Sequence, residues 1–125
     1  MSEDRTAILT FQDVSVLLEI ANLACQKGLP SAARTIVDGV LAEKPGFVPA
    51  LITLAYSHVV VDEFDVALEM LEGILTEHPD DDDARCMEIL ALMLAGRNDD
   101  AKKSMEGFSQ DCPQKQLAWA LIENI

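Results

Sequence analysis

Residues 38–45 read DGVLAEKP, and residues 72–79 read EGILTEHP. Glycine, leucine, glutamate and proline coincide between the two stretches at an offset of 34 residues. The same offset relates Ala33 to Ala67 and Ala101, and it carries the closing proline from Pro79 to Pro113. A repeat of this length is typical of stacked helix pairs, since one pair cannot bury its apolar face without a neighbour. We therefore expect an all-α domain with three helix pairs, over residues 14–47, 48–81 and 82–113, and a closing helix over 114–124.

Local signals place the ends of these helices. Thr10 with Asp13 is typical of a capping box that opens the first helix, and Gly28 ends it. The second helix is expected over 30–44 and the third over 48–61. Asp62 is expected to cap the fourth, Asp80 or Asp81 the fifth, which ends at residue 95, and Asn98 the sixth, which ends near residue 109. No long alternation of apolar and polar residues indicates a strand.

Composition narrows the class of protein. Half of the 125 residues are apolar, and the net charge is −13, which disfavours binding to nucleic acid or to anionic lipid. No stretch approaches the roughly 18 apolar residues of a membrane helix, and the first ten residues lack the pattern of a signal peptide. Three widely spaced cysteines indicate reduced thiols, so we expect a cytoplasmic protein of one domain, with no insertion into a membrane.

The repeat resembles the tetratricopeptide repeat family. That motif has a leucine and a small residue on the first helix, an aromatic residue and an alanine on the second, and a closing proline. The second repeat supplies Leu51, Leu54, Ala55, Phe64, Ala67, Leu71 and Pro79. The third repeat departs from the motif, with Arg85 and Glu88 at positions that are usually apolar. The resemblance implies a right-handed superhelix with a concave groove.

In this family the second, fifth, ninth, twelfth and thirteenth residues of each repeat line the groove. Carried over, these positions predict a partner-binding set of Leu18, Asn22, Cys25, Ile52, Tyr56, Val59, Val60, Cys86, Leu90, Met93 and Leu94, with Ser15, Gln26, Pro49 and Asp83 beside it. Most are apolar and none is basic, which favours an amphipathic partner helix over an acidic peptide tail. An alternative is that the closing helix fills part of the groove with Leu117, Trp119, Leu121 and Ile122, and self-association through the same surface is another.

Size, repeat number, acidity and an apolar groove together resemble the small chaperones of bacterial type III secretion that hold the needle subunit. The resemblance implies sequestration of an amphipathic helix of that subunit before it polymerises, often with a second small helical chaperone. Two alternatives stay open at this point: a generic repeat adaptor in another bacterial complex, and a structural subunit of a larger repeat array.

The residues that carry chemistry in other proteins do not form a known arrangement here. His58 and His78 lack zinc-ligand spacing, and His58 occupies a helix-packing position. The acidic run at residues 80–83 lacks the spacing of a calcium loop and precedes a helix, where negative charge is favourable. We therefore expect no enzymatic activity, no metal site and no cofactor.

Overall fold

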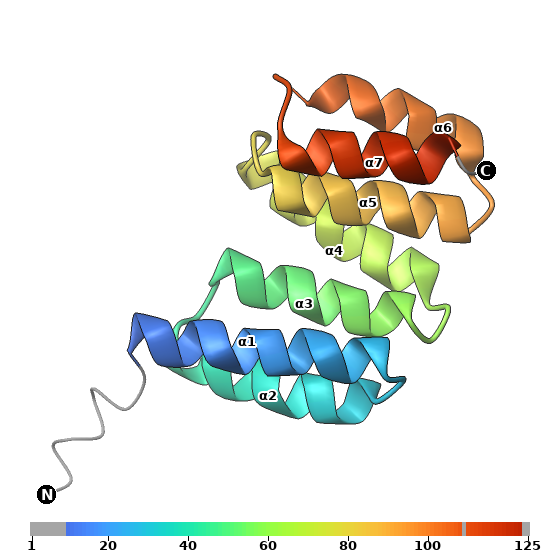
Figure 1. The fold of residues 1–125 in the computed structure, drawn as a ribbon. Helices are drawn as coiled ribbons and strands as arrows, with labels where there is room; N and C mark the ends of the chain where they lie inside the picture. The colour runs from blue at the N-terminus through green and yellow to red at the C-terminus, as the bar shows by residue number, and fades with distance from the viewer. Residues whose placement is uncertain (1–9, 109, 124–125) are drawn as a thin grey trace, which may run out of the picture.

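The computed structural model describes residues 10–108 and 110–123, and all the regular structure among them is helical (Figure 1). In chain order the elements are α1 (Phe11–Gln26), α2 (Pro30–Glu43), α3 (Val48–Val59), α4 (Phe64–Glu77), α5 (Asp82–Leu94), α6 (Asn98–Ser104), the 3₁₀ turn η2 (Met105–Gly107) and α7 (Pro113–Glu123). The prediction of an all-α protein is confirmed. The sixth helix is shorter than expected because its last turn tightens into η2, and Ser109 and Asn124 lie outside the described residues.

The turns that follow α1, α3 and α5 have the same backbone conformation at the 34-residue offset. Gly28, Asp62 and Gly96 all have a positive φ, at 77°, 65° and 81°. Glycine, and less often aspartate, adopts this left-handed conformation at a helix end. In each turn a backbone N–H donates to the carbonyl five residues earlier: Leu29 to Ala24 at 2.8 Å, Glu63 to His58 at 2.9 Å, and Arg97 to Leu92 at 2.8 Å.

Two of the predicted helix caps are wrong by one residue each. Asp62 is the left-handed residue of its turn, so it lies one residue too early, and Glu63 occupies the N-cap of α4. Asn98 is the first residue within α6, and Arg97 occupies the N-cap. The caps of α1 and α5 are as predicted: Thr10 and Asp13 exchange two hydrogen bonds, and Asp81 Oδ1 accepts from the Ala84 N–H at 2.9 Å.

The helices form a repeat-like stack. Each of α1 to α5 contacts the next helix in the chain, and α1 also contacts α3, α3 contacts α5, and α5 contacts α7. The odd-numbered helices therefore follow one another in a row, which Figure 1 shows from the side of α1, α5 and α7. The even-numbered helices α2, α4 and α6 pack against the helices of this row.

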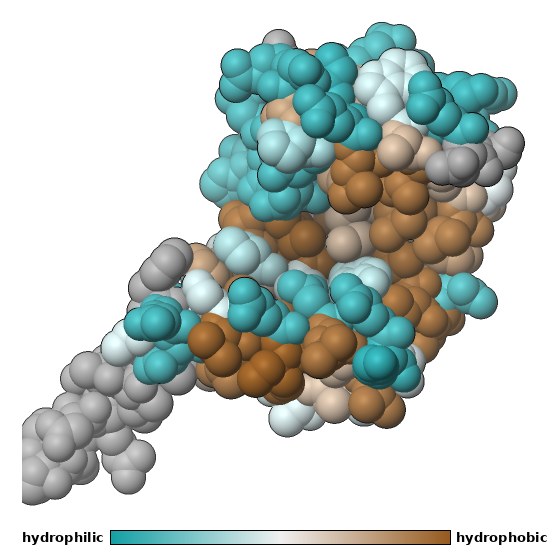
Figure 2. All heavy atoms as spheres, viewed as in Figure 1, coloured by the Kyte–Doolittle hydropathy of each residue, from teal (hydrophilic) through white to brown (hydrophobic). Residues whose placement is uncertain are grey.

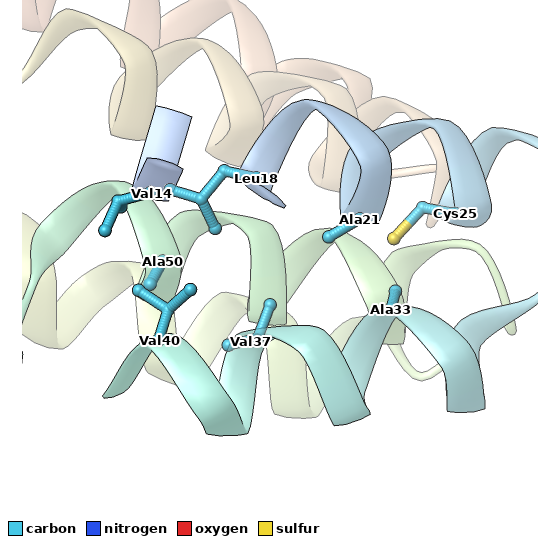
Figure 3. Packing of buried hydrophobic residues seen from close by; sticks show 8 residues of the cluster. All are labelled: Val14, Leu18, Ala21, Cys25, Ala33, Val37, Val40 and Ala50. Atoms are coloured by element: carbon cyan, nitrogen blue, oxygen red, sulfur yellow. The ribbon is translucent and has the colours of Figure 1, made fainter. Parts of the chain in front are cut away.

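The buried residues of the core recur at the 34-residue offset of the repeat. Figure 3 shows the first cluster, in which α1 and α2 pack through Val14, Leu18, Ala21, Cys25, Ala33, Val37 and Val40, with Ala50 from α3. Ala33, Ala67 and Ala101 are fully buried at successive 34-residue offsets, as are Ala50, Ala84 and Ala118. Small side chains at these positions let neighbouring helix axes approach closely. Because Ala118 belongs to α7, the offset continues into the closing helix.

A polar cluster joins α2 to α3 and to the turn after it. Arg34 Nε donates to the buried Ser57 Oγ at 2.9 Å, and this hydroxyl donates in turn to the Leu54 carbonyl at 2.6 Å. Arg34 Nη2 donates to the Ser57 carbonyl at 3.2 Å. His58 Nδ1 lies 2.7 Å from Glu63 Oε1. This hydrogen bond from His58 is the main reason why the pKa of Glu63 lies below its ordinary value, and Arg34 lowers it further.

The lowered pKa of Glu63 predicts a dependence of stability on pH. A carboxyl group whose folded pKa is depressed stabilises the fold above its unfolded pKa, and this contribution disappears as pH falls through the folded pKa. We expect the Glu63→Gln variant to lose less stability than the unmodified chain as pH falls below about 4.5, the ordinary value for glutamate. Urea unfolding from pH 3 to 7 measures this difference. Glu77→Gln, an exposed substitution at the opposite end of α4, serves as the control. An equally weak dependence of stability on pH in that variant contradicts the assignment.

The departure of the third repeat from the family pattern has a structural explanation. Arg85 and Glu88 are partly buried and lie 3.8 Å apart between Nη1 and Oε1. Arg85 also donates to the Pro79 carbonyl at 3.2 Å, and Ser104 Oγ donates to the Glu88 carboxylate. Gly107 leaves the space that the Arg85 guanidinium occupies, since a Cβ there would lie 2.2 Å from Arg85 Cζ. Glu88 therefore joins α5 to α6 through Ser104, and the Arg85 guanidinium lies against η2 at Gly107.

Candidate partner-binding groove

A groove of about 520 Å³ runs across the row of odd-numbered helices, between α1 and α3 on one side and α5 and α7 on the other. Figure 2 shows the hollow, with apolar surface gathered over α5 and α7. Residues of all four helices line it: Leu18, Asn22, Gln26, Pro49, Ile52, Thr53, Tyr56, Asp83, Cys86, Met87, Leu90, Gln114, Leu117 and Leu121. We call this surface the groove.

Two positions of the repeat supply the predicted residues that the structure brings together. The fifth position gives Leu18, Ile52 and Cys86, and the ninth gives Asn22, Tyr56 and Leu90; all six line the groove. Each ninth residue follows the fifth by four, so both lie on the same face of their helix. Gln26, Pro49 and Asp83 also line the groove, whereas Ser15 is exposed outside it.

The other five residues of the predicted set do not line the groove. Cys25 and Val59 are 1% and 2% exposed and belong to the core. Met93 packs against the third core cluster, and Val60 against the first. Cys25, Val59 and Met93 all occupy the twelfth position, near the end of the first helix of a pair, and each packs in one cluster with residues of the following helix. Leu94 is 56% exposed at the end of α5, outside the groove.

The closing helix completes one wall of the groove. Leu117 and Leu121 line it, as the fold-back alternative expects, whereas Ile122 lies in the third core cluster and Trp119 is 48% exposed beside a separate shallow pocket. Leu117 follows Asp83 by 34 residues, and Leu121 follows Met87 by the same offset. Continuing the second repeat position past Pro113 would therefore have found Leu117 from the sequence, whereas Leu121 corresponds to Met87, which is not at one of the five groove positions.

The groove is mainly apolar, with a polar rim. Gln114 Nε2 donates to Asp83 Oδ1 at 3.0 Å, which ties α7 to α5 at one end. Burial raises the pKa of the Cys86 thiol, and the nearby Asp83 carboxylate raises it further, so Cys86 presents a neutral side chain. Burial likewise raises the pKa of the Tyr56 hydroxyl. Among the described residues that line the groove, none is basic and one, Asp83, is acidic.

A second cavity of about 520 Å³ lies between α4, α5 and α6. Its walls are charged, and several of these charges pair with one another, as in the Arg85–Glu88 pair and the Arg97–Asp100 pair at 3.0 Å. Such a surface offers little apolar contact. The apolar groove is therefore the better candidate for a binding site.

Within the described residues, no group of three or more histidine, cysteine, aspartate or glutamate side chains is arranged to hold a metal ion. None of the described helices has the length and apolar character needed to span a membrane.

Comparison of the chain with protein-family models, with curated protein sequences and with solved structures found no match in any of the three.

Proposed function

We propose that this protein is a tetratricopeptide-type chaperone that binds an amphipathic helix of a partner in the groove. In this proposal α1–α2, α3–α4 and α5–α6 are the three helix pairs of a right-handed superhelix, and α7 caps it. The recurrence of the same left-handed turn at Gly28, Asp62 and Gly96 supports this pairing. The contacts of α1 with α3 and of α3 with α5 also support it.

The observation that carries the proposal is the apolar lining of a groove shared by four helices. Ile52, Tyr56 and Leu90 are only half-buried there, and Leu117 is 57% exposed. A helix laid in such a groove buries its apolar side chains against these residues, at about 25 cal/mol per Å² of apolar surface removed from water. The absence of basic residues from the described lining disfavours an acidic peptide as the ligand.

The partner that we propose is a subunit that polymerises through its own apolar helix, of the type that builds a type III secretion needle. Holding that helix in the groove keeps the subunit monomeric until export, without any chemical step. The three cysteines are free, which fits action in the reducing cytoplasm. The net charge of −13 further suits a partner whose polar residues are neutral or basic.

Site-specific photo-cross-linking tests this function. A benzophenone amino acid is placed at Ile52 in the groove, or at Val66, which is exposed on α4 outside it. We expect the Ile52 probe to give one dominant adduct in the native host, on an apolar-faced helix of a small secreted subunit. Equal labelling from the Val66 probe, or no adduct from Ile52, contradicts the proposal.

A polymerisation assay separates the chaperone from a generic adaptor. The captured subunit is allowed to assemble with increasing amounts of this protein, and assembly is followed by light scattering. A chaperone of the proposed type abolishes assembly at a one-to-one ratio. An adaptor binds the partner and leaves its assembly unchanged.

A further inference from the structure

The outer face of α1 carries an apolar stripe that lies away from the groove. Val16, Ile20 and Leu23 are 48%, 48% and 51% exposed. They are spaced by four and three residues, so they lie on one side of the helix. Figure 2 shows apolar surface over α1, separated from the hollow by polar atoms. Leu18 and Asn22, which line the groove, lie on a different side of the helix.

Two positions of this stripe have equivalents on α3 and α5, at offsets of 34 and 68 residues, and these equivalents are buried. The positions equivalent to Val16 are Ala50 and Ala84, and those equivalent to Leu23 are Ser57 and Ala91; all four are fully buried. They lie on α3 and α5, which pack against the preceding helices α2 and α4. In α1 the same positions have larger apolar side chains and are half-exposed.

The stripe continues as a heptad seam with opposite charges at its two ends. Asp13, Val16, Ile20, Leu23 and Lys27 are separated by three, four, three and four residues. This spacing is that of the a and d positions of a coiled coil. Asp13 lies seven residues before Ile20, and Lys27 lies seven residues after it, which is about 10 Å of helix on either side.

We propose that α1 pairs with α1 of a second copy of this chain, antiparallel, about a two-fold axis that passes at Ile20. Such an interface is self-complementary, as a two-fold dimer requires. It places Ile20 against Ile20, buries Val16 and Leu23, and sets Asp13 of each copy beside Lys27 of the other. A parallel pairing would instead set Asp13 against Asp13 and Lys27 against Lys27.

Charge selects this face for self-association. The chain carries −13, so most surfaces of two copies repel each other. The two charged residues of the seam are one acid and one base, which cancel across the antiparallel pair, and the exposed Glu19 lies on the neighbouring side of the helix. The interface leaves the groove open, because no residue of the seam lines it.

Mass measurement across concentration tests the pairing. Sedimentation equilibrium of the full chain, from about 1 to 500 μM since a single helix pair is a small interface, is expected to show a shift from one chain to two. Ile20→Glu is expected to weaken dimerisation at least thirtyfold. Ser15→Glu, which adds the same charge to an exposed position of α1 away from the seam, is expected to leave it unchanged. A mass of one chain throughout, or a dimer insensitive to Ile20→Glu, overturns the proposal.

Further variants test the antiparallel orientation. Lys27→Glu is expected to weaken the dimer about two- to fivefold, because it sets two acidic side chains beside each other across the pair. A cysteine at Ile20 is expected to form a disulfide between two copies on mild oxidation, because the axis brings residue 20 of each copy together. A cysteine at Val16 is expected not to cross-link to itself. Cross-linking at Val16 as efficient as at Ile20 contradicts the two-fold arrangement.

Discussion

Replacing Leu71 by alanine lowers the free energy of unfolding by about 2–5 kcal/mol. Leu71 is fully buried on α4 and is among the largest such side chains in the described residues. It packs in the second core cluster, between helices that small residues bring close together, so the surrounding backbone has little freedom to collapse into the cavity. A loss of this size is a large fraction of the 5–15 kcal/mol that stabilises an ordinary domain.

Urea unfolding followed by circular dichroism measures the effect. Val66→Ala is the matched control, because Val66 lies on the same helix and is 44% exposed. Its substitution should change stability by no more than about 0.5 kcal/mol. Equal losses in the two variants would show that α4 does not pack on the stack through Leu71.

Replacing Leu90 by glutamate weakens binding of the partner helix by about 2 kcal/mol or more, which is about thirtyfold. Leu90 lies in the middle of α5 and lines the groove. A carboxylate at this position is buried against the apolar face of the bound helix, where no described basic residue of the groove lining can pair with it. The free protein keeps its fold, because Leu90 is only partly buried.

Leu94→Glu controls for the added charge. Leu94 lies on the same helix four residues later, is exposed, and does not line the groove. Titration of a fluorescently labelled partner helix is expected to give unchanged affinity for Leu94→Glu. If both variants weaken binding to the same extent, the effect is one of overall charge and the groove is not the site.

The sequence was sufficient to predict the helices because the repeat and the local signals agree. Proline at residues 45, 79 and 113 marks the end of each proposed pair, and glycine at 28 and 96 marks the turn within it. The turn at Asp62 was harder to predict, since aspartate is both a good N-cap and a tolerated left-handed residue. The backbone settles the choice, because Asp62 has a φ of 65°, as Gly28 and Gly96 have positive φ values at 34-residue offsets on either side.

The composition of the groove was predictable only in part. The fifth and ninth positions of each repeat line it, whereas Cys25 and Val59 at the twelfth position belong to the core. A pattern of residue types does not separate these cases, since an apolar side chain suits both a core and an apolar groove. The contribution of α7 was underestimated because Leu117 and Leu121 lie beyond the last proline of the repeat.

The central claim is that the groove binds the partner helix, and methyl chemical-shift mapping tests it most directly. The full chain, labelled at isoleucine and leucine methyl groups, is titrated with a peptide of the captured helix. We predict the largest shifts at Ile52, Leu90 and Leu117, all of which line the groove, with little change at the exposed Leu94. Shifts confined to Leu94 and to Ile20 and Leu23 of α1, with the groove methyl groups unmoved, would contradict the account.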